Sequence, residues 1–335
     1  MDLIYFLIVT VFITYYLACL NNTKIEFRFV LCICFIILST CLRELVDLEL
    51  NRDYYGYYLG YSLERPESLL AYFTKEPYLY LIHNFFLFFT TDYKKALGLV
   101  YVFNFILNTL FFVWLMFKKD IVVWKKMLIF IFYYFLFGYT LLRNGPVYML
   151  FGVFFYNSFR NYGFKKVLFT PFFHFSSVLI LVTYFHRSKY YFKFLALFTM
   201  LASLFYYFLF EHISGLSEFE KTLSKVDSYS EQLDKVSVFH YYFLAFIVFN
   251  VFISYYFLKE RFFHPIIIST VVFYFIAFFI ATPVVAYRIS PYFIISLLFF
   301  NTEKDSNKEL NRVLNISAFF LLPFFIFTYI DNHNL

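Results

Sequence analysis

The chain has 335 residues, of which 62% are apolar, 27% are aromatic and only 15% are charged, and its net charge is +6. A soluble globular protein carries about 25% charged residues, so this composition argues against a soluble domain and against intrinsic disorder, and it indicates a protein embedded in lipid. The basic residues form short clusters between apolar runs rather than a continuous basic stripe, which argues against nucleic-acid binding.

Apolar runs long enough for membrane-spanning helices, which need about 20 residues, recur along the whole chain. The first run, residues 2–20, has no basic start and no small-residue cleavage site, so we interpret it as a retained span rather than as a signal peptide. We expect an all-α polytopic integral membrane protein, with residues 1–335 forming a single membrane domain of about 10–12 transmembrane or re-entrant helices. The ten predicted spans are 2–20, 27–42, 96–117, 127–142, 147–159, 192–210, 240–258, 265–282, 287–300 and 313–330.

The distribution of Lys and Arg among the short loops predicts the orientation. Basic loops such as 118–126 and 186–193 are expected in the cytoplasm. The long loops 43–76 and 211–239 are net acidic and are expected in the periplasm, which also places the N-terminus outside. Two further apolar stretches are harder to fit. Residues 77–91 are expected to dip into the membrane or to lie in its interface, and residues 167–185 to form a re-entrant hairpin or a single crossing.

Charged residues within an apolar bundle are expensive, so they are candidates for function. Arg143 lies between two predicted spans that are short for full crossings, and we expect its turn, with Pro146 at the first position of the next helix, to be sunk below the outer surface. An arginine there is suited to binding phosphate oxygens, although it could also anchor the turn by snorkelling. Arg288, between Pro283 and Pro291, is predicted at a second outer turn with the same two interpretations.

Three candidate bases and several sugar or anion ligands lie in the first outer loop and in the segment 167–185. Asp53 and Glu76 of the first outer loop are candidate general bases, and Arg43 at its start is a candidate anion ligand. The neighbouring tyrosines, Tyr54 and Tyr57 among them, are candidates for stacking on sugar rings, although the whole loop also fits a solvated connector. His174, beside Pro171, is either a core histidine or a third candidate base facing a cavity.

The order of these residues resembles that in a known group of proteins. The sequence contains Arg43, then Asp53-Tyr54-x-x-Tyr57, Glu76-Pro77-Tyr78, Leu142-Arg143, Phe173-His174-x-Ser176-Ser177 and finally Arg288. Over about residues 1–300 this resembles the EpsG/Wzy group of bacterial polysaccharide polymerases, which includes O-antigen polymerases. The chain departs from the family pattern at Asn51 and Arg52, where the family has glycine and threonine, and at Asn144, where it has glutamine.

The resemblance implies a glycosyltransferase C-like fold and an enzyme of the bacterial inner membrane whose active site faces the periplasm. Such a polymerase transfers a growing glycan from undecaprenyl pyrophosphate onto an undecaprenyl-pyrophosphate-linked repeat unit, without a metal or cofactor, and a chain-length regulator is a possible partner. It implies that Arg143, with Arg288 or Arg43, binds the pyrophosphate and that Asp53, Glu76 or His174 is the base. Tyr54, Tyr57 and Asn144 are the corresponding sugar ligands.

Two other classes of membrane protein fit the same composition. A membrane-bound O-acyltransferase has similar size, but that class places a histidine near its first span, whereas the first histidine of this chain is His83. A flippase or transporter of lipid-linked oligosaccharides would show repeat symmetry between its two halves, which the sequence does not show.

Overall fold

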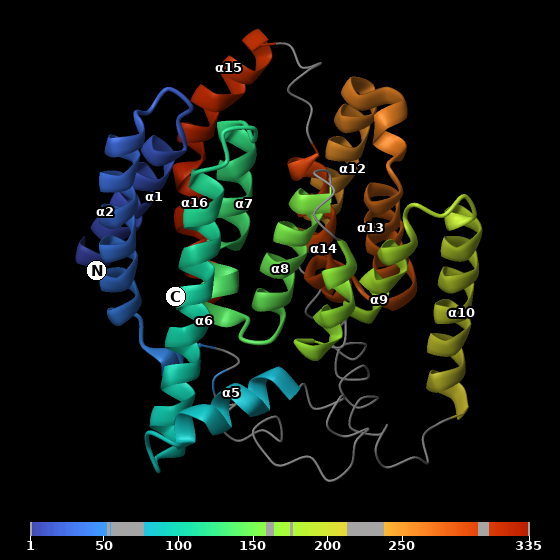
Figure 1. The fold of residues 1–335 in the computed structure, drawn as a ribbon, viewed down its shortest axis with the longest axis horizontal. Coiled ribbons are helices and arrows are strands. Elements are labelled where there is room, and N and C mark those ends of the chain that lie inside the picture. The colour runs from blue at the N-terminus through green and yellow to red at the C-terminus, as the bar shows by residue number, and fades with distance from the viewer. Residues whose placement is uncertain are drawn as a thin grey trace. The chain divides into compact units, whose positions relative to one another are not determined.

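A computed structural model describes residues 2–51, 54, 77–158, 164–174, 177–212, 238–300 and 308–333 (Figure 1). Within these residues the structure contains helices and no strand, and every predicted span is helical. The corresponding helices are α1 (Asp2–Cys19), α2 (Ile25–Glu44), α6 (Tyr93–Met116), α7 (Val123–Phe135) with the π-helix η3 (Leu136–Thr140), α8 (Asn144–Ser158), α10 (Tyr191–His212), α12 (Val238–Leu258), α13 (Pro265–Ile276) with the π-helix η9 (Ala277–Ala281), α14 (Pro283–Phe299), and α15 (Lys308–Ser317), which continues through η10 (Ala318–Leu321) into α16 (Leu322–His333).

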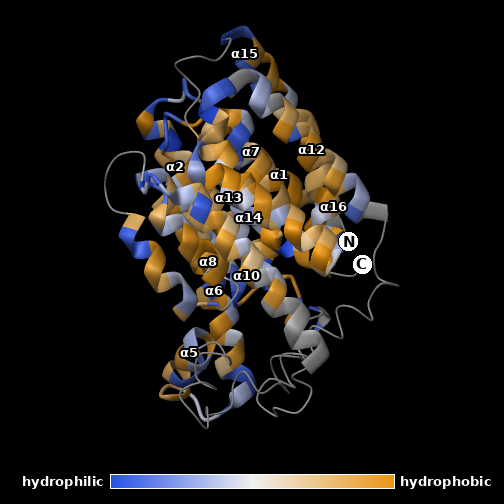
Figure 2. Ribbon diagram, turned by 90° about the vertical axis from the view of Figure 1, so that its right-hand side faces the viewer, coloured by the Kyte–Doolittle hydropathy of each residue, from blue (hydrophilic) through white to orange (hydrophobic). Residues whose placement is uncertain are grey.

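Three of the described helices are long and apolar enough to cross a bilayer. They are α2, α6 and the continuous helix at Lys308–Asp331. Shorter apolar stretches lie within α1, α10, α12 and α14 and in the continuous helix of α13 and η9, at Leu3–Cys19, Tyr191–Leu201, His240–Tyr256, Pro283–Phe299 and Pro265–Ala281. Figure 2 shows that hydrophobic residues make up most of the helices. The prediction of an all-α membrane protein is therefore confirmed at this level, and the full number of crossings stays a prediction.

The chain divides into two compact units. The first comprises Met1–Val153, Thr170–Phe175 and Asn301–Leu335, and the second comprises Phe154–Phe169 and Ser176–Phe300. Since the division reflects packing within each unit, the expectation of a single membrane domain is not tested by it.

The first unit is a bundle in which α1, α2, α6, α7 and α16 lie side by side (Figure 1). Its core is aromatic: the ring of Phe130 on α7 stacks on Tyr15 of α1 at 3.9 Å between centroids and on Phe325 of α16 at 4.7 Å. All three residues are completely buried. Because both terminal helices contribute to this core, residues from the two ends of the chain complete one hydrophobic centre.

Buried cations cap two helices of the first unit at the end where α1 and α6 terminate. Nη2 of Arg28 donates to the carbonyl oxygen of Leu20, just after α1, at 2.8 Å. Nζ of Lys126 donates to the carbonyl oxygen of Met116, the last residue of α6, at 3.4 Å. Both side chains are at most 1% exposed. Cations at helix C-termini satisfy carbonyls that lack an intrahelical partner and interact favourably with the helix dipole.

The predicted outer segment 77–91 contains one short helix, α5 (Pro77–Leu87), which runs crosswise to α6 in Figure 1. Eleven residues are too few to cross a bilayer. The helix buries Tyr78, Leu79 and His83 and leaves Leu81 and Phe85 exposed. This short helix with exposed apolar side chains is consistent with the expectation that the segment does not span the membrane.

Two predicted helix starts are displaced in the structure. α8 begins at Asn144, so Pro146 is its third residue rather than its first, which is tolerated because the first helical N–H groups have no acceptor. α14 begins at Pro283, where the hydroxyl of Thr282 accepts from the backbone N–H of Val285 at 3.3 Å. The expectation that Arg288 lies at a turn is therefore wrong, because Arg288 lies inside α14.

The segment 167–185 is divided into short helical pieces. They are η4 (Phe164–Phe172), α9 (Val178–Leu181) and η6 (Val182–Phe185), none of which is long enough to span a bilayer. Whether the segment re-enters the membrane stays a prediction.

Candidate functional site

The side chain of Arg43 is a buried cation enclosed by aromatic rings. It lies in the last turn of α2 and is 5% exposed, so α2 extends into the predicted outer loop 43–76. Its guanidinium carbon Cζ lies 5.1 Å from the ring centroid of Tyr139 and 5.8 Å from that of Tyr101, within the range of cation–π contacts. Nε of Arg43 has no hydrogen-bond partner in the described part of the chain. The buried guanidinium therefore retains a donor that the described residues leave unused.

Tyr139 lies in the π-helix η3, where the backbone N–H of Leu141 donates to the carbonyl oxygen of Leu136 at 2.9 Å. A π-helix leaves a local bulge in an otherwise α-helical segment, and such bulges are frequent at functional sites. The carbonyl oxygen of Tyr139 accepts a hydrogen bond of 2.6 Å from Nδ2 of buried Asn51. The chain that follows α2 is thereby attached to the residue whose ring faces Arg43.

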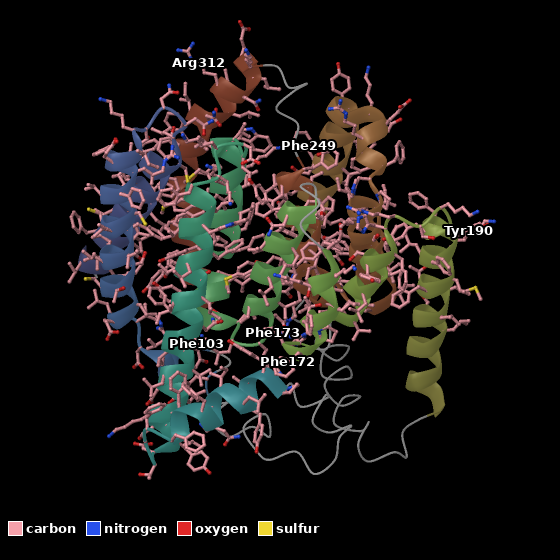
Figure 3. The ribbon with its side chains drawn as sticks, in the orientation of Figure 1. Phe103, Phe172, Phe173, Tyr190, Phe249 and Arg312 are labelled. Atoms are coloured by element: carbon pink, nitrogen blue, oxygen red, sulfur yellow. The ribbon has the colours of Figure 1, made fainter. Side chains whose placement is uncertain are left out.

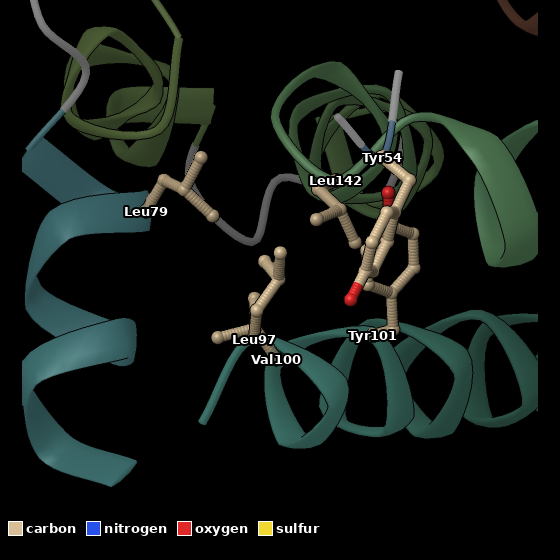
Figure 4. Packing of buried hydrophobic residues seen from close by; sticks show 6 residues of the cluster. All are labelled: Tyr54, Leu79, Leu97, Val100, Tyr101 and Leu142. Carbon is tan, nitrogen blue, oxygen red and sulfur yellow. The ribbon is translucent and has the colours of Figure 1, made fainter. Parts of the chain in front are cut away.

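Three segments that carry predicted site residues meet in one apolar cluster of the first unit (Figure 4). Tyr54, which follows Asp53 in the sequence, packs with Tyr101 at 6.1 Å between ring centroids. Leu142, which precedes Arg143, and Leu79 of α5 belong to the same cluster. The full cluster is Tyr54, Leu79, Leu97, Val100, Tyr101 and Leu142.

The start of the predicted hairpin contacts α5, which contributes Leu79 to the same apolar cluster. The ring of Phe173, which precedes His174, packs on Tyr78 of α5 at 4.9 Å between centroids. His174 is half-buried, and its backbone N–H donates to the carbonyl oxygen of Thr170 at 3.3 Å. The hydroxyl of Tyr78 is buried without a partner among the described residues, and burial raises the pKa of this side chain.

An ion pair connects the short segment between α2 and Asn51 to the start of α6. Glu49 of η1 (Leu48–Leu50) pairs with Lys94 at the start of α6. The carboxylate of Asp92 caps this helix, accepting from the backbone N–H of Lys94 at 2.9 Å and of Lys95 at 3.3 Å. The beginning of α6 therefore contacts the segment that contains Asn51 through an exposed ion pair.

The predicted site residues differ in what the structure describes of them. Asp53, Tyr57 and Glu76 lie outside the described residues. Arg143 is half-buried, and Asn144 is 8% exposed with an Oδ1 atom that has no partner in the described ranges.

Two further predicted residues have distinct surroundings. Tyr54 is 3% exposed, so its ring packs against protein, and its role as a sugar ligand stays a prediction. Arg288 is half-buried in α14 and belongs to the second unit.

Sequence reasoning missed the polar residues of α6 and η3 that shape this region. Asn104 and Asn108 are at most 1% exposed, and their amide groups donate to carbonyl oxygens of Phe137 and Tyr134 at 2.6 and 3.1 Å. The available signal was a pair of asparagines four residues apart inside an apolar run, since this spacing places both amides on one helix face.

The arrangement can bind an anionic group through a buried guanidinium whose Nε has no hydrogen-bond partner in the described ranges. Within those ranges no three His, Cys, Asp or Glu side chains are close enough to share a metal ion, so we assign no metal ligands. Comparisons with known protein families, curated proteins and solved structures find no match for the chain.

Proposed function

We propose that this protein is a glycan polymerase of the bacterial inner membrane with a glycosyltransferase C-like fold, of the type that the EpsG/Wzy group represents. It transfers a growing glycan from undecaprenyl pyrophosphate onto an incoming undecaprenyl-pyrophosphate-linked oligosaccharide at the periplasmic face. The observation that supports this most is the position of Arg43: its buried guanidinium lies against Tyr139 and Tyr101, in the same unit as the cluster of Tyr54 and Leu142.

In the proposed reaction the bond between the anomeric carbon of the donor glycan and the pyrophosphate oxygen breaks, and a bond from the acceptor hydroxyl oxygen to that carbon forms. Negative charge develops on the departing pyrophosphate, so cations fixed before the reaction lower the barrier. Arg43 and Arg143 are assigned this role, with Arg288 as a further candidate. The acceptor hydroxyl loses its proton to a base, for which Asp53, Glu76 and His174 are the candidates.

A gene replacement in the source bacterium tests this proposal. Cells that carry Arg43→Ala or Arg143→Ala are expected to attach mainly single repeat units to their surface glycan, because loss of one preorganised donor slows such reactions about 10²–10³-fold. Arg43→Lys keeps the charge but not the planar, multi-donor geometry, so we expect intermediate chain lengths. Arg312→Ala is the matched control, because Arg312 is an exposed arginine on α15 (Figure 3).

The amount of each variant in the membrane is measured by immunoblot, so that loss of protein is separated from loss of activity. Wild-type chain lengths with Arg43→Ala and with Arg143→Ala at normal protein levels would refute the proposal. Glycans of unchanged length that lack acyl groups would identify an O-acyltransferase instead. Accumulation of lipid-linked repeat units in the cytoplasmic leaflet would identify a flippase.

A further inference from the structure

Asn104 of α6 makes a short side-chain hydrogen bond to the π-helix η3. Its Nδ2 donates to the carbonyl oxygen of Phe137 at 2.6 Å, and the side chain is 1% exposed. Each hydrogen bond of a π-helix spans one residue more than in an α-helix, so some carbonyl groups near its ends lack a backbone N–H donor. An amide donor at Phe137 satisfies one of these groups and therefore favours the π-helical register over the α-helical one.

The same carbonyl oxygen also contacts the beginning of α8. A Cβ atom added at Gly145 would lie 2.9 Å from the oxygen of Phe137, which is closer than real Cβ contacts normally allow. Gly145 follows Arg143 and Asn144 directly, and its backbone N–H donates to the carbonyl oxygen of Leu141 at 3.1 Å. The Phe137 carbonyl therefore lies between the amide of Asn104 and the chain that carries Arg143.

The register of η3 determines where the ring of Tyr139 lies. Tyr139 is two residues beyond Phe137, and its ring is the nearer of the two aromatic faces on Arg43. A one-residue change of helical register rotates each side chain by about 100° around the helix axis. Loss of the π-helical register would therefore move this ring away from the guanidinium.

We propose that Asn104 is a positioning residue for Arg43 and Arg143: its amide fixes the Phe137 carbonyl, which holds Tyr139 against Arg43 and sets the start of α8 beside Arg143. This inference rests on the proposed function for its catalytic meaning, but the geometry it asserts is measurable without any glycan. Asn104 itself has no described contact with either guanidinium, so it acts through the backbone of η3.

The test is the Nε–Hε resonance of Arg43 in full-length protein labelled with [¹⁵N]arginine in detergent micelles. The wild-type signal, assigned by its loss in Arg43→Lys, is expected to be shifted upfield by the ring currents of Tyr139 and Tyr101. Asn104→Leu removes the donor while it keeps the number and branching of the side-chain heavy atoms, and it is expected to return this signal toward that of a solvated arginine. Gly145→Ala displaces the same carbonyl from its other side and is expected to have the same effect.

Thr109→Val is the matched control, because Thr109 is a buried residue of α6 whose hydroxyl has no partner in the described part of the chain. This variant should leave the Arg43 signal unchanged. An Arg43 signal that stays at its wild-type position in folded Asn104→Leu would overturn the inference. If Asn104→Leu does not fold, a signal that stays at the wild-type position in folded Gly145→Ala would overturn it.

The polymerisation assay then separates this inference from the proposed function. If both are correct, Asn104→Leu slows chain growth about tenfold or more at normal protein level, as expected when reacting groups are misplaced by a fraction of an ångström to 1 Å. If the Arg43 signal moves in Asn104→Leu while Arg43→Ala and Arg143→Ala keep wild-type chain lengths, the positioning role stands and the proposed reaction fails.

Discussion

The close packing between Gly138 and Asn108 gives a sharp prediction about the π-helix. A Cβ atom added at Gly138 would lie 2.4 Å from Nδ2 of Asn108, whereas ordinary contacts begin near 3.4 Å, so the amide must move by about 1 Å. This motion breaks its 3.1 Å hydrogen bond to the carbonyl oxygen of Tyr134 inside a buried region. Gly138→Ala should therefore destabilise the protein.

The expected size follows from opposing contributions. Leaving a buried amide and carbonyl without partners costs about 1–3 kcal/mol, and forcing extra volume into a packed core costs about 1–3 kcal/mol more. Replacing glycine by alanine within a helix returns about 0.5–1 kcal/mol. We expect a net loss near 3 kcal/mol, measured as a fall in the free energy of unfolding or in the apparent melting temperature of the protein in detergent.

Gly98 provides the matched control. It lies in α6, and a Cβ atom added there meets no atom within 4 Å, so Gly98→Ala should be neutral or slightly stabilising. In an Asn108→Ala background the obstructing amide is absent and only a 3.3 Å contact with the Cβ of residue 108 remains, so the addition of Gly138→Ala should cost much less than in the wild type. Equal stability of Gly138→Ala and the wild type would refute this reasoning, as would a double-mutant cycle without coupling between positions 138 and 108.

Three further predictions concern stability alone. Burial, and to a lesser degree His186, lower the pKa of His264 to about 4 from an unfolded value near 6.5, so the folded state prefers the neutral ring. The stability of the folded protein should be complete above pH 6.5 and fall by about 2 kcal/mol toward pH 4, an energy already reduced for the partial exposure of the ring. His264→Asn should show a weaker pH dependence in thermal melts. Arg28→Ala removes the donor at the end of α1 and should lower stability by about 2–3 kcal/mol in the same melts. Lys119→Ala, at an exposed lysine, should have almost no effect. Equal melting temperatures of these two variants would contradict the capping role of Arg28. Phe130→Ala should cost about 3–5 kcal/mol because its completely buried ring touches Tyr15 and Phe325, and an effect no larger than that of Phe85→Ala, at a half-exposed ring, would count against the aromatic core.

The positions of the helices could be predicted from sequence because each one is a nearly continuous apolar run. The packing partners of each helix could not be predicted, because a helix that is apolar on most sides has no periodic face that indicates what it packs against. The boundaries also moved where local chemistry outweighed hydropathy. The hydroxyl of Thr282 and the ring of Pro283 start α14 before the apolar run at residue 287, and this places Arg288 within the helix.

The candidate site was predictable in its charged residues and not in its polar support. Arg43 and Arg143 are conspicuous because charges are rare in such a sequence. The π-helix at Leu136–Thr140 has no composition that distinguishes it from the α-helix before it, because its register depends on Asn51 and Asn104 from elsewhere in the chain. Contacts between residues 33 and 88 positions apart are a property of the packed bundle rather than of any local motif.

The aromatic core that joins α1, α7 and α16 has a consequence for biosynthesis. A protein is synthesised from its N-terminus, so the ring of Phe130 and its partner Tyr15 are present long before Phe325. The first bundle must therefore remain open at its centre while residues 154–300 are made. The aromatic core is complete only when α16 has been made, long after the α2 helix that carries Arg43.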